Sequence, residues 1–175
     1  VYAYDARTGK QAWRYNTGRA VSATPVYAVI DGRPMLFVAS SDRKLYALDP
    51  RPGLPRDADR VLWSKEILVF RQTVNPARMA DPLLAPIGGK PTVFFAAWLN
   101  DQSGTENVQR GDLLAVEPKD GTVRWRRTIG TGAVNAPCLG KVKGRPALFV
   151  PYEAGAIHAI SLDDGSDLWD EPFAV

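Results

Sequence analysis

One cysteine and one histidine are the first residues in this chain to examine for chemistry. Cys138 stands in the segment Ala136–Leu139, and the matching position of an earlier segment holds Val26. A free cysteine among apolar residues behaves as a small hydrophobic side chain, so Cys138 is predicted to be a buried packing residue. A single cysteine also excludes an intrachain disulfide and a cysteine-based zinc cluster.

His158 lies close in sequence to Ser161 and Asp163, which together are the residue types of a nucleophilic triad. The Gly-x-Ser-x-Gly turn that would expose such a serine is missing. In the other copies of the repeat described below, the position of His158 is held by Tyr2, Tyr46 and Leu114. A position that accepts tyrosine and leucine is a packing position. We therefore predict that the imidazole packs against neighbours with one nitrogen hydrogen-bonded.

Two other segments contain groups that could bind ions. Five acidic residues fall within nine positions near the end of the chain, namely Asp163, Asp164, Asp167, Asp170 and Glu171. Clustered carboxylates could hold Ca²⁺, but the same turn recurs elsewhere without the cluster, which favours a solvated turn. Gly88-Gly89-Lys90 partly matches a phosphate-binding loop, yet Pro91 removes a backbone amide that such a loop needs. It is predicted to be a hairpin turn.

Composition limits the class of protein. The chain has 175 residues and a net charge of +3, with 45% hydrophobic and 23% charged residues, values that exclude a disordered chain. No apolar stretch approaches the roughly 18 residues that span a bilayer. The small net charge, without a basic and aromatic stripe, argues against a nucleic-acid partner. Scattered glycine and proline favour short strands joined by turns.

A repeat organises the chain. The pattern Ala-x₅-Gly-x₃-Trp occurs three times, over Ala3–Trp13, Ala115–Trp125 and Ala159–Trp169. A fourth copy begins at Ala47 and carries six extra residues before Trp63. A fixed pattern that recurs in this way is typical of a protein built from stacked structural units.

A second motif alternates with the first. Gly-[Arg/Lys]-Pro followed by apolar residues occurs over Gly32–Phe37, Gly89–Phe94 and Gly144–Phe149, and a small residue followed by proline precedes each copy. Glycine and proline at these places predict a tight turn between strands. The unit that contains the first copy is therefore predicted to hold four strands, over Thr24–Ile30, Met35–Ser40, Lys44–Asp49 and Arg60–Ile67. Units of this size with four strands are typical of β-propeller blades.

The pattern Ala-x-Asp-x₃-Gly-x₃-Trp resembles the tryptophan-docking repeat of the PQQ-like, quinoprotein-type β-propeller family. Ala3–Trp13 matches it fully, whereas Glu117 and Ser161 replace the aspartate and the copy before Trp63 carries the insertion. The resemblance implies an all-β propeller of four-stranded antiparallel blades, with each tryptophan between adjacent blades. Trp13, Trp125 and Trp169 should then be largely buried, and Trp13 should be the least sensitive to substitution.

The predicted organisation is a single partial propeller domain over residues 1–175. A blade end occupies residues 1–18, and fuller blades occupy about residues 21–67, 81–130 and 134–173. Three and a half blades are fewer than the seven or eight usual in the family, so we expect a fragment of a longer propeller. An open arc completed by oligomerisation is the alternative. The segment 75–80 between two blades is expected to form a helical turn.

The functional hypothesis is a non-catalytic binding or scaffold module for a protein or carbohydrate partner. Contacts are expected through the insertions at residues 50–60 and 100–111, which should lie on opposite faces because they expand different strand connections. No catalytic, cofactor-binding or metal-binding residue is assigned. The resemblance implies a periplasmic or extracytoplasmic location.

The resemblance also implies an alternative, in which the chain is part of a PQQ- and calcium-dependent alcohol or sugar dehydrogenase. Enzymes of that type hold PQQ with a stacking tryptophan, acidic and asparagine calcium ligands, and often a Cys-Cys disulfide. This chain has no Cys-Cys pair, and Trp98 is the one tryptophan outside the docking pattern. A membrane-anchored kinase sensor or an assembly factor is a third, non-enzymatic reading of the same repeat.

Overall fold

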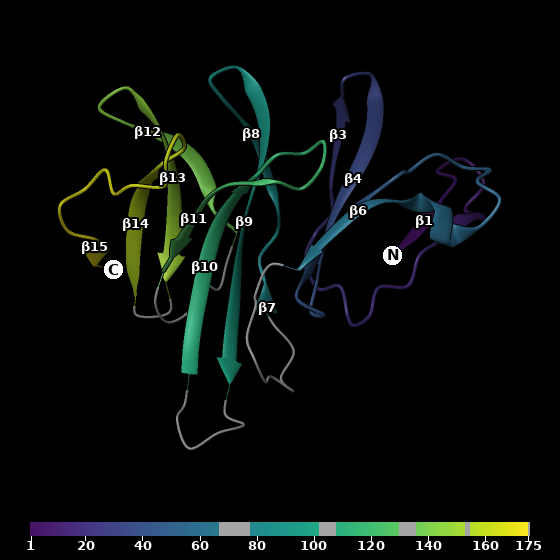
Figure 1. The fold of residues 1–175 in the computed structure, drawn as a ribbon, viewed down its shortest axis with the longest axis horizontal. Helices are drawn as coiled ribbons and strands as arrows, with labels where there is room; N and C mark the ends of the chain where they lie inside the picture. The colour runs from purple at the N-terminus through teal and green to yellow at the C-terminus, as the bar shows by residue number, and fades with distance from the viewer. Residues whose placement is uncertain (67–77, 102–107, 130–135, 153–154, 175) are drawn as a thin grey trace.

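The computed structural model describes residues 1–66, 78–101, 108–129, 136–152 and 155–174. These residues form four antiparallel sheets that lie side by side along the molecule (Figure 1). The first sheet pairs β1 (Tyr2–Tyr4) with β2 (Gln11–Arg14). The second contains β3 (Val26–Ile30), β4 (Arg33–Ser40), β5 (Lys44–Leu48) and β6 (Val61–Glu66). Helix is limited, in the described part of the chain, to a 3₁₀ turn at Asp57–Arg60.

The third and fourth sheets follow the same order. The third contains β7 (Arg78–Met79), β8 (Leu83–Ile87), β9 (Lys90–Asp101), β10 (Val108–Val116) and β11 (Val123–Thr128). The fourth contains β12 (Cys138–Val142), β13 (Arg145–Tyr152), β14 (Ala156–Ser161) and β15 (Phe173–Ala174). The predicted all-β fold of four-stranded antiparallel units is therefore confirmed.

The edge of the third sheet opposite β11 is formed by two short strands. Long strand β9 pairs with β8 at its start and with β7 at its end. The helical turn expected over residues 75–80 is wrong for Arg78 and Met79, which form β7, and residues 75–77 lie outside the described part. The extended conformation is favoured because it adds these two residues to the ladder of β9.

The Gly-[Arg/Lys]-Pro motifs form the hairpin turns that were predicted. The two central residues of each turn have positive φ, at 49° and 77° for Asp31-Gly32, 54° and 79° for Gly88-Gly89, and 49° and 83° for Lys143-Gly144. Two successive positive φ angles define the tight turn whose twist matches antiparallel strands, and glycine or aspartate tolerates them best. Gly88-Gly89-Lys90 is therefore a hairpin turn rather than a phosphate loop.

The two motifs meet within each sheet. Phe94 lies opposite Ala115 on the neighbouring strand, and Ala115 lies opposite Trp125 on the next. The small alanine between them lets the two rings meet, with centroids 5.8 Å apart. The same contact recurs between Phe37 and Trp63 at 6.0 Å. Alanine at this place of the repeat is thus explained by the aromatic contact across it.

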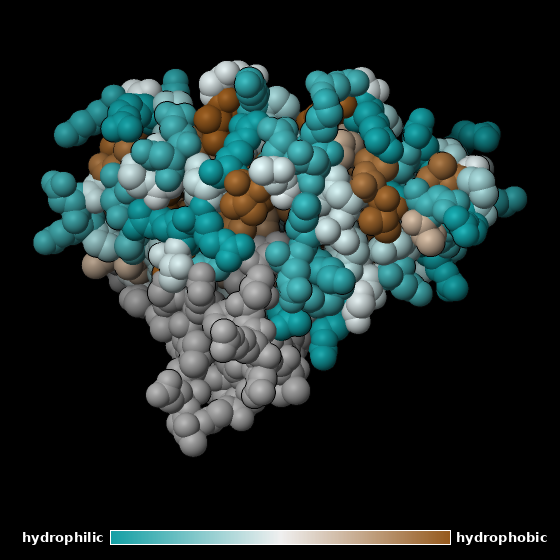
Figure 2. Space-filling view, viewed as in Figure 1, coloured by the Kyte–Doolittle hydropathy of each residue, from teal (hydrophilic) through white to brown (hydrophobic). Residues whose placement is uncertain are grey.

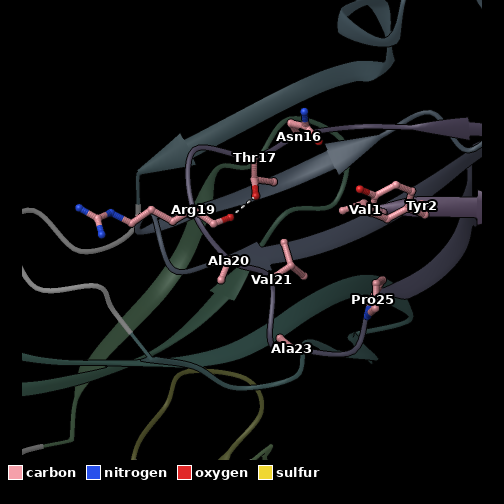
Figure 3. A pocket seen from close by; sticks show the side chains of 9 residues that line it. All are labelled: Val1, Tyr2, Asn16, Thr17, Arg19, Ala20, Val21, Ala23 and Pro25. Carbon is pink, nitrogen blue, oxygen red and sulfur yellow. Dashed lines mark hydrogen bonds between the residues drawn. The ribbon is translucent and has the colours of Figure 1, made fainter.

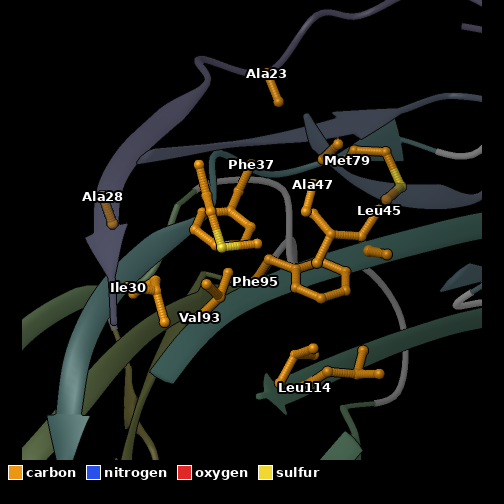
Figure 4. Close-up of a cluster of buried hydrophobic side chains, with 14 residues drawn as sticks. Ala23, Ala28, Ile30, Phe37, Leu45, Ala47, Met79, Val93, Phe95 and Leu114 are labelled. Carbon is orange, nitrogen blue, oxygen red and sulfur yellow. The ribbon is translucent and has the colours of Figure 1, made fainter. Parts of the chain in front are cut away.

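Apolar side chains fill the spaces between the sheets. Figure 4 shows the cluster between the second and third sheets, in which Phe37 and Leu45 face Phe95 and Leu114. A second cluster joins the third and fourth sheets, and a smaller one joins the first sheet to the second. Both faces of the central strands are covered, which explains their continuously apolar sequences. The sheets hence support one another by stacking.

The turn before each tryptophan is held by its backbone. The amide of Gly9 donates to the carbonyl of Asp5 at 2.8 Å, and the amide of Gly121 donates to the carbonyl of Glu117 at 2.9 Å. The carboxylate of Asp5 also accepts the amide of Thr8 at 2.7 Å, and hydrogen bonds from Thr8 lower the pKa of Asp5. Because the essential acceptor is a carbonyl, glutamate can replace aspartate without loss of the turn.

Candidate functional site

Tryptophan side chains join each sheet to the next one along the chain. The indole N–H of Trp13 donates to the carbonyl of Pro50 at 2.8 Å, and that of Trp63 donates to the carbonyl of Pro118 at 2.9 Å. Trp125 repeats the bond to Leu162 at 2.8 Å. Each acceptor lies in the turn that precedes the last strand of the following sheet.

A glycine in the accepting turn lies directly under the indole at two of these junctions. A Cβ atom added to Gly121 would stand 2.8 Å from Trp63, and one added to Gly165 would stand 2.8 Å from Trp125. Both glycines also have positive φ, at 76° and 73°. Glycine is thus required here both by the backbone and by the close approach of the ring.

The junction at Trp13 is different because of the insertion at residues 50–60. Gly53 has nothing within 4 Å of its added Cβ. The side chain of Arg60 takes its place, with the guanidinium carbon 4.3 Å from the centre of the Trp13 ring. Arg60 is 2% exposed and Trp13 is 5% exposed. A desolvated guanidinium over an indole is a strong form of cation–π contact.

Arg60 also fastens the insertion to the sheet. One terminal nitrogen donates to the carbonyls of Asp49 at 3.1 Å and Arg51 at 2.6 Å, and Nε lies 3.4 Å from a carboxylate oxygen of Asp57. One buried side chain therefore connects the start and the end of the loop. Sequence reasoning missed Arg60, because charged residues are rarely buried; the displaced glycine before Trp63 was the available signal.

Ion pairs connect other residues in and beside the insertion at residues 50–60. Arg51 binds the carboxylate of Asp49 with two nitrogens, at 2.9 and 2.5 Å, and this hydrogen bonding lowers the pKa of Asp49. Arg56 pairs with Asp59 at 2.6 Å across the 3₁₀ turn. The side chains of Arg51 and Arg56 are 59% and 78% exposed. The loop is thus fixed from within and presents two arginines to solvent.

The second predicted loop is shorter than expected. Residues 100–101 end β9 and residues 108–111 begin β10, where Val108 pairs with Asp101. The insertion at 100–111 therefore lengthens a hairpin, because paired strands satisfy their backbone groups better than an irregular loop would. Residues 102–107 lie outside the described part of the chain.

Cys138 is exposed, which corrects the prediction that it is buried. It pairs with Phe149, so it shares the face of the fourth sheet that is turned away from the third. In the second sheet the matching Val26 faces the third sheet, whereas in the described residues no further sheet covers the fourth. The comparison of Cys138 with Val26 therefore gave a wrong prediction of burial.

His158 packs as predicted. Its ring meets the ring of Tyr152 edge-on, with centroids 4.0 Å apart, and Nδ1 lies 3.7 Å from a carboxylate oxygen of Asp167. That distance is too long for the predicted hydrogen bond. The hydroxyl of the neighbouring Tyr152 is also affected by this packing, because burial raises the pKa of Tyr152 to about 12. Ser161 lies three positions from His158 along β14, an odd separation that points its side chain to the other face, so the structure does not bring a triad together.

Two of the five acidic residues near the C-terminus have separate partners. Asp167 pairs with Arg127 at 2.5 Å, and Asp164 accepts the amide and hydroxyl of Ser166, which lowers its pKa. No group of three or more histidine, cysteine, aspartate or glutamate side chains that could hold a metal occurs among the described residues.

Trp98 is buried, with 8% of its surface exposed. The guanidinium of Arg78 lies 5.2 Å from the centre of its ring, so one face of the indole is covered by a cation. Its indole nitrogen has no hydrogen-bond partner in the described part of the structure. Trp98 therefore packs within the arc rather than offering an open stacking surface.

Two hollows flank the connection between the first two sheets. The larger, of about 510 Å³, is lined by Val1 and Tyr2 and by residues of the β2–β3 connection, namely Asn16, Thr17, Arg19, Ala20, Val21, Ala23 and Pro25 (Figure 3). The smaller, of about 400 Å³, is lined by polar and charged residues around Asp42. Neither was predicted, since their residues come from separate repeats. Among the described residues, no helix has the length and apolar character needed to cross a membrane.

Known proteins resemble this chain in sequence. Quinoprotein alcohol dehydrogenase PedH of Pseudomonas putida is 26% identical over 137 residues, which cover 75% of this chain and 20% of that protein. Quinohemoprotein alcohol dehydrogenase ADH IIB of Pseudomonas putida is 28% identical over 160 residues, which cover 87% of this chain and 19% of that protein. The chain thus spans about a fifth of the length of these curated relatives.

A solved structure shares the fold. Quinohemoprotein alcohol dehydrogenase ADHIIG of Pseudomonas putida HK5 matches 98% of this chain and 34% of that chain, with a TM-score of 0.60 and 16% identity. The likeness identifies the four sheets as part of a β-propeller ring. A family model described as outer membrane protein assembly factor BamB matches residues 1–174. The repeats, the stacked sheets and this match together show that the chain belongs to the PQQ-like β-propeller repeat family.

Proposed function

We propose that this section of a β-propeller is a non-catalytic binding module for a macromolecular partner, with residues 50–60 as its contact loop. The observation that carries the proposal is the buried Arg60, which stacks on Trp13 and bonds two carbonyls of the loop. A loop ordered before binding loses less conformational entropy when it meets a partner. A solvated insertion without function has no need of such an anchor.

The tryptophans give this loop a firm base. We propose that Trp13, Trp63 and Trp125 act as the docking residues of the repeat, since each bonds the turn of the following sheet. Binding residues are commonly carried on loops positioned by a rigid scaffold. The repeated junctions would supply that rigidity here.

The exposed chemistry of the loop favours a protein partner with carboxylates on its surface. Arg51 and Arg56 present guanidinium groups to solvent, and these bind carboxylates with good geometry. Figure 2 shows, for the face in view, hydrophilic residues over most of the described surface, with hydrophobic residues in small separate groups. We therefore expect polar contacts of modest affinity. The family description, an outer membrane protein assembly factor, supports an extracytoplasmic location for this interaction.

Site-specific photo-crosslinking tests the proposal. A photoreactive phenylalanine at Leu54, inside the loop, is expected to give discrete protein adducts in the source cells. The same probe at Leu139, an exposed residue of the fourth sheet, is the matched control and should give none. Reversing the most exposed loop charge, Arg56→Glu, should weaken the Leu54 adducts. Equal adducts at both positions, or Leu54 adducts that the charge reversal does not weaken, would argue against the loop as a contact site.

A second candidate function is favoured by the two Pseudomonas putida relatives, which are alcohol dehydrogenases. A quinone with calcium needs a free stacking surface and a set of oxygen ligands. In the described residues Trp98 is covered by Arg78, and no set of three potential metal ligands occurs. These residues do not fit the group, and we derive no chemical step through it.

Titration with PQQ and Ca²⁺ separates the two candidates. Tryptophan fluorescence is expected to show no saturable quenching at micromolar PQQ, because the described residues offer neither the stacking face nor the ligands. Dye reduction with a primary alcohol should stay at the background rate. Saturable quenching together with alcohol-dependent dye reduction would replace the binding module with the dehydrogenase.

A further inference from the structure

A polar hollow of about 400 Å³ lies between the β2–β3 connection and the second sheet, and it shares Arg19 with the hollow of Figure 3. Its walls come from the β2–β3 connection, the β4–β5 turn, and the facing ends of β5 and β6. The lining residues are Gly18, Arg19, Ser41, Asp42, Arg43, Lys44, Tyr46 and Glu66. This volume is within the range that holds a small molecule.

The acidic groups of the hollow are already engaged. The carboxylate of Asp42 accepts the hydroxyl of Tyr46 at 2.5 Å, the amide of Gly18 at 2.9 Å and the amide of Lys44 at 3.1 Å. Glu66 pairs with Arg43 at 3.2 Å. Asp42 therefore holds the walls together and has little capacity left for a ligand.

The cationic groups exceed the acidic ones. Arg19, Arg43 and Lys44 line the hollow with two acids, and the side chains of Arg19 and Lys44 have no ion pair among the described residues. Ser41 adds a hydroxyl that can donate a hydrogen bond. Arg19 and Lys44 are thus donors that carry positive charge and, together with the Ser41 hydroxyl, suit an anion.

The backbone at Arg43 supports the same conclusion. Arg43 has φ of 71°, a left-handed conformation that costs energy for any residue except glycine. Its amide donates to the carbonyl of Ser40 at 3.0 Å. In the fourth sheet the matching turn holds Gly155 with the same φ of 71°, and its amide donates to the carbonyl of Tyr152 at 3.1 Å. An arginine thus occupies a place where the same fold elsewhere uses glycine.

Strain of this kind persists where the side chain has a use. The use visible here is the position of the guanidinium, which lies in the wall of the hollow beside Glu66. We propose that this hollow binds a small oxyanion, with a carboxylate or phosphate group held by Arg43 and Lys44 and covered by Arg19. Both groups present oxygens that a guanidinium can bind through two parallel hydrogen bonds. The inference does not depend on the proposed contact loop.

Calorimetric titration of the 175-residue chain at low ionic strength tests the site. The probes are succinate and inorganic phosphate, with the neutral diamide succinamide as the control ligand. At least one anion should bind with saturation, whereas succinamide should not. Succinate binding alone would identify a carboxylate ligand, and phosphate binding alone would identify a phosphate ligand.

Arg43→Gly is the decisive variant, because Gly155 shows that glycine fits this turn. It should weaken anion binding by about tenfold or more, as expected from the loss of a charge-assisted pair of hydrogen bonds, while the Tm stays the same or rises. Lys44→Gln should weaken binding by about threefold or more. Lys119→Gln, an exposed lysine in the third sheet, should leave binding unchanged.

Two results would overturn the proposal. One is anion binding of equal strength in the parent chain and in both Arg43→Gly and Lys44→Gln, which would indicate general attraction to a cationic surface. The other is an absence of saturable binding for both anions in a chain whose melting curve is intact.

Discussion

Replacement of Trp125 by alanine is expected to lower the free energy of unfolding by about 3 kcal/mol, the lower end of the range for a buried aromatic residue, because its side chain is only partly buried. The indole packs on Phe94 with ring centroids 5.8 Å apart and lies over Gly165 of the next sheet. Its loss would also leave the carbonyl of Leu162 without the donor that it has at 2.8 Å. Urea unfolding followed by circular dichroism near 218 nm measures the change.

Trp169 is the matched control for Trp125. It has the same contact within its own sheet, to Phe149 at 5.5 Å, but no turn of a following sheet lies against it in the described structure. Replacement of Trp169 by alanine should therefore cost clearly less, about 1 kcal/mol, because only the contact within the sheet is lost. Equal losses at Trp125 and Trp169 would mean that the bond to the next sheet contributes little.

The direction of these contacts could not be predicted from the repeat. Spacing identified the tryptophans, but a periodic pattern is the same whether each ring packs on the preceding unit or on the following one. We expected Trp13 to be the least sensitive, with its neighbour missing. The structure contradicts the reason for that expectation, since Trp13 bonds Pro50 of the second sheet and is the most buried of the repeat tryptophans. Among the described residues, Trp169 is the repeat tryptophan with no turn of a following sheet against it.

Strands and turns were predictable because they depend on local chemistry. Glycine at positive φ marks the hairpins, and the apolar runs give β3–β6 within a few residues of the expected ranges. Features that depend on contacts between sheets were not predictable. Cys138 is exposed because its face of the sheet is uncovered, and residues 100–101 and 108–111 are strand because they pair with each other.

The position of the candidate site at residues 50–60 was predictable, but the contacts that hold its loop in place were not. The insertion at 50–60 was recognised as a departure from the repeat, and the structure finds a fixed loop there. The means of fixing it, a guanidinium stacked on Trp13, follows from the displaced glycine only once the ring is in place. A charged side chain that is 2% exposed is not a residue that hydrophobic patterning can identify.

Replacement of Arg60 by alanine is expected to lower the free energy of unfolding by about 3–4 kcal/mol, because a desolvated cation–π contact of about 2 kcal/mol is lost and two carbonyls lose a charged donor. Arg60→Lys keeps the charge, but a single ammonium cannot both cover the indole and reach the carbonyls of Asp49 and Arg51. The lysine variant should therefore lie between the parent and the alanine variant. Chemical denaturation followed by tryptophan fluorescence measures both.

The same substitution should release the loop, and this second effect distinguishes an anchor from a residue that merely fills space. Trypsin cleaves after Arg56 only when the loop opens, so Arg60→Ala should speed cleavage at that bond by about tenfold or more under native conditions, as expected when a locally closed segment is destabilised by more than 1.4 kcal/mol. Lys119→Ala, which removes an ion pair whose two side chains are 73% and 75% exposed, is the control and should leave both stability and the cleavage rate after Arg56 nearly unchanged. If Arg60→Ala destabilises the protein but leaves cleavage after Arg56 unchanged, Arg60 stabilises the junction without ordering the loop. The preorganisation on which the proposed contact site rests would then have to come from Asp49 and Asp59 and their ion pairs.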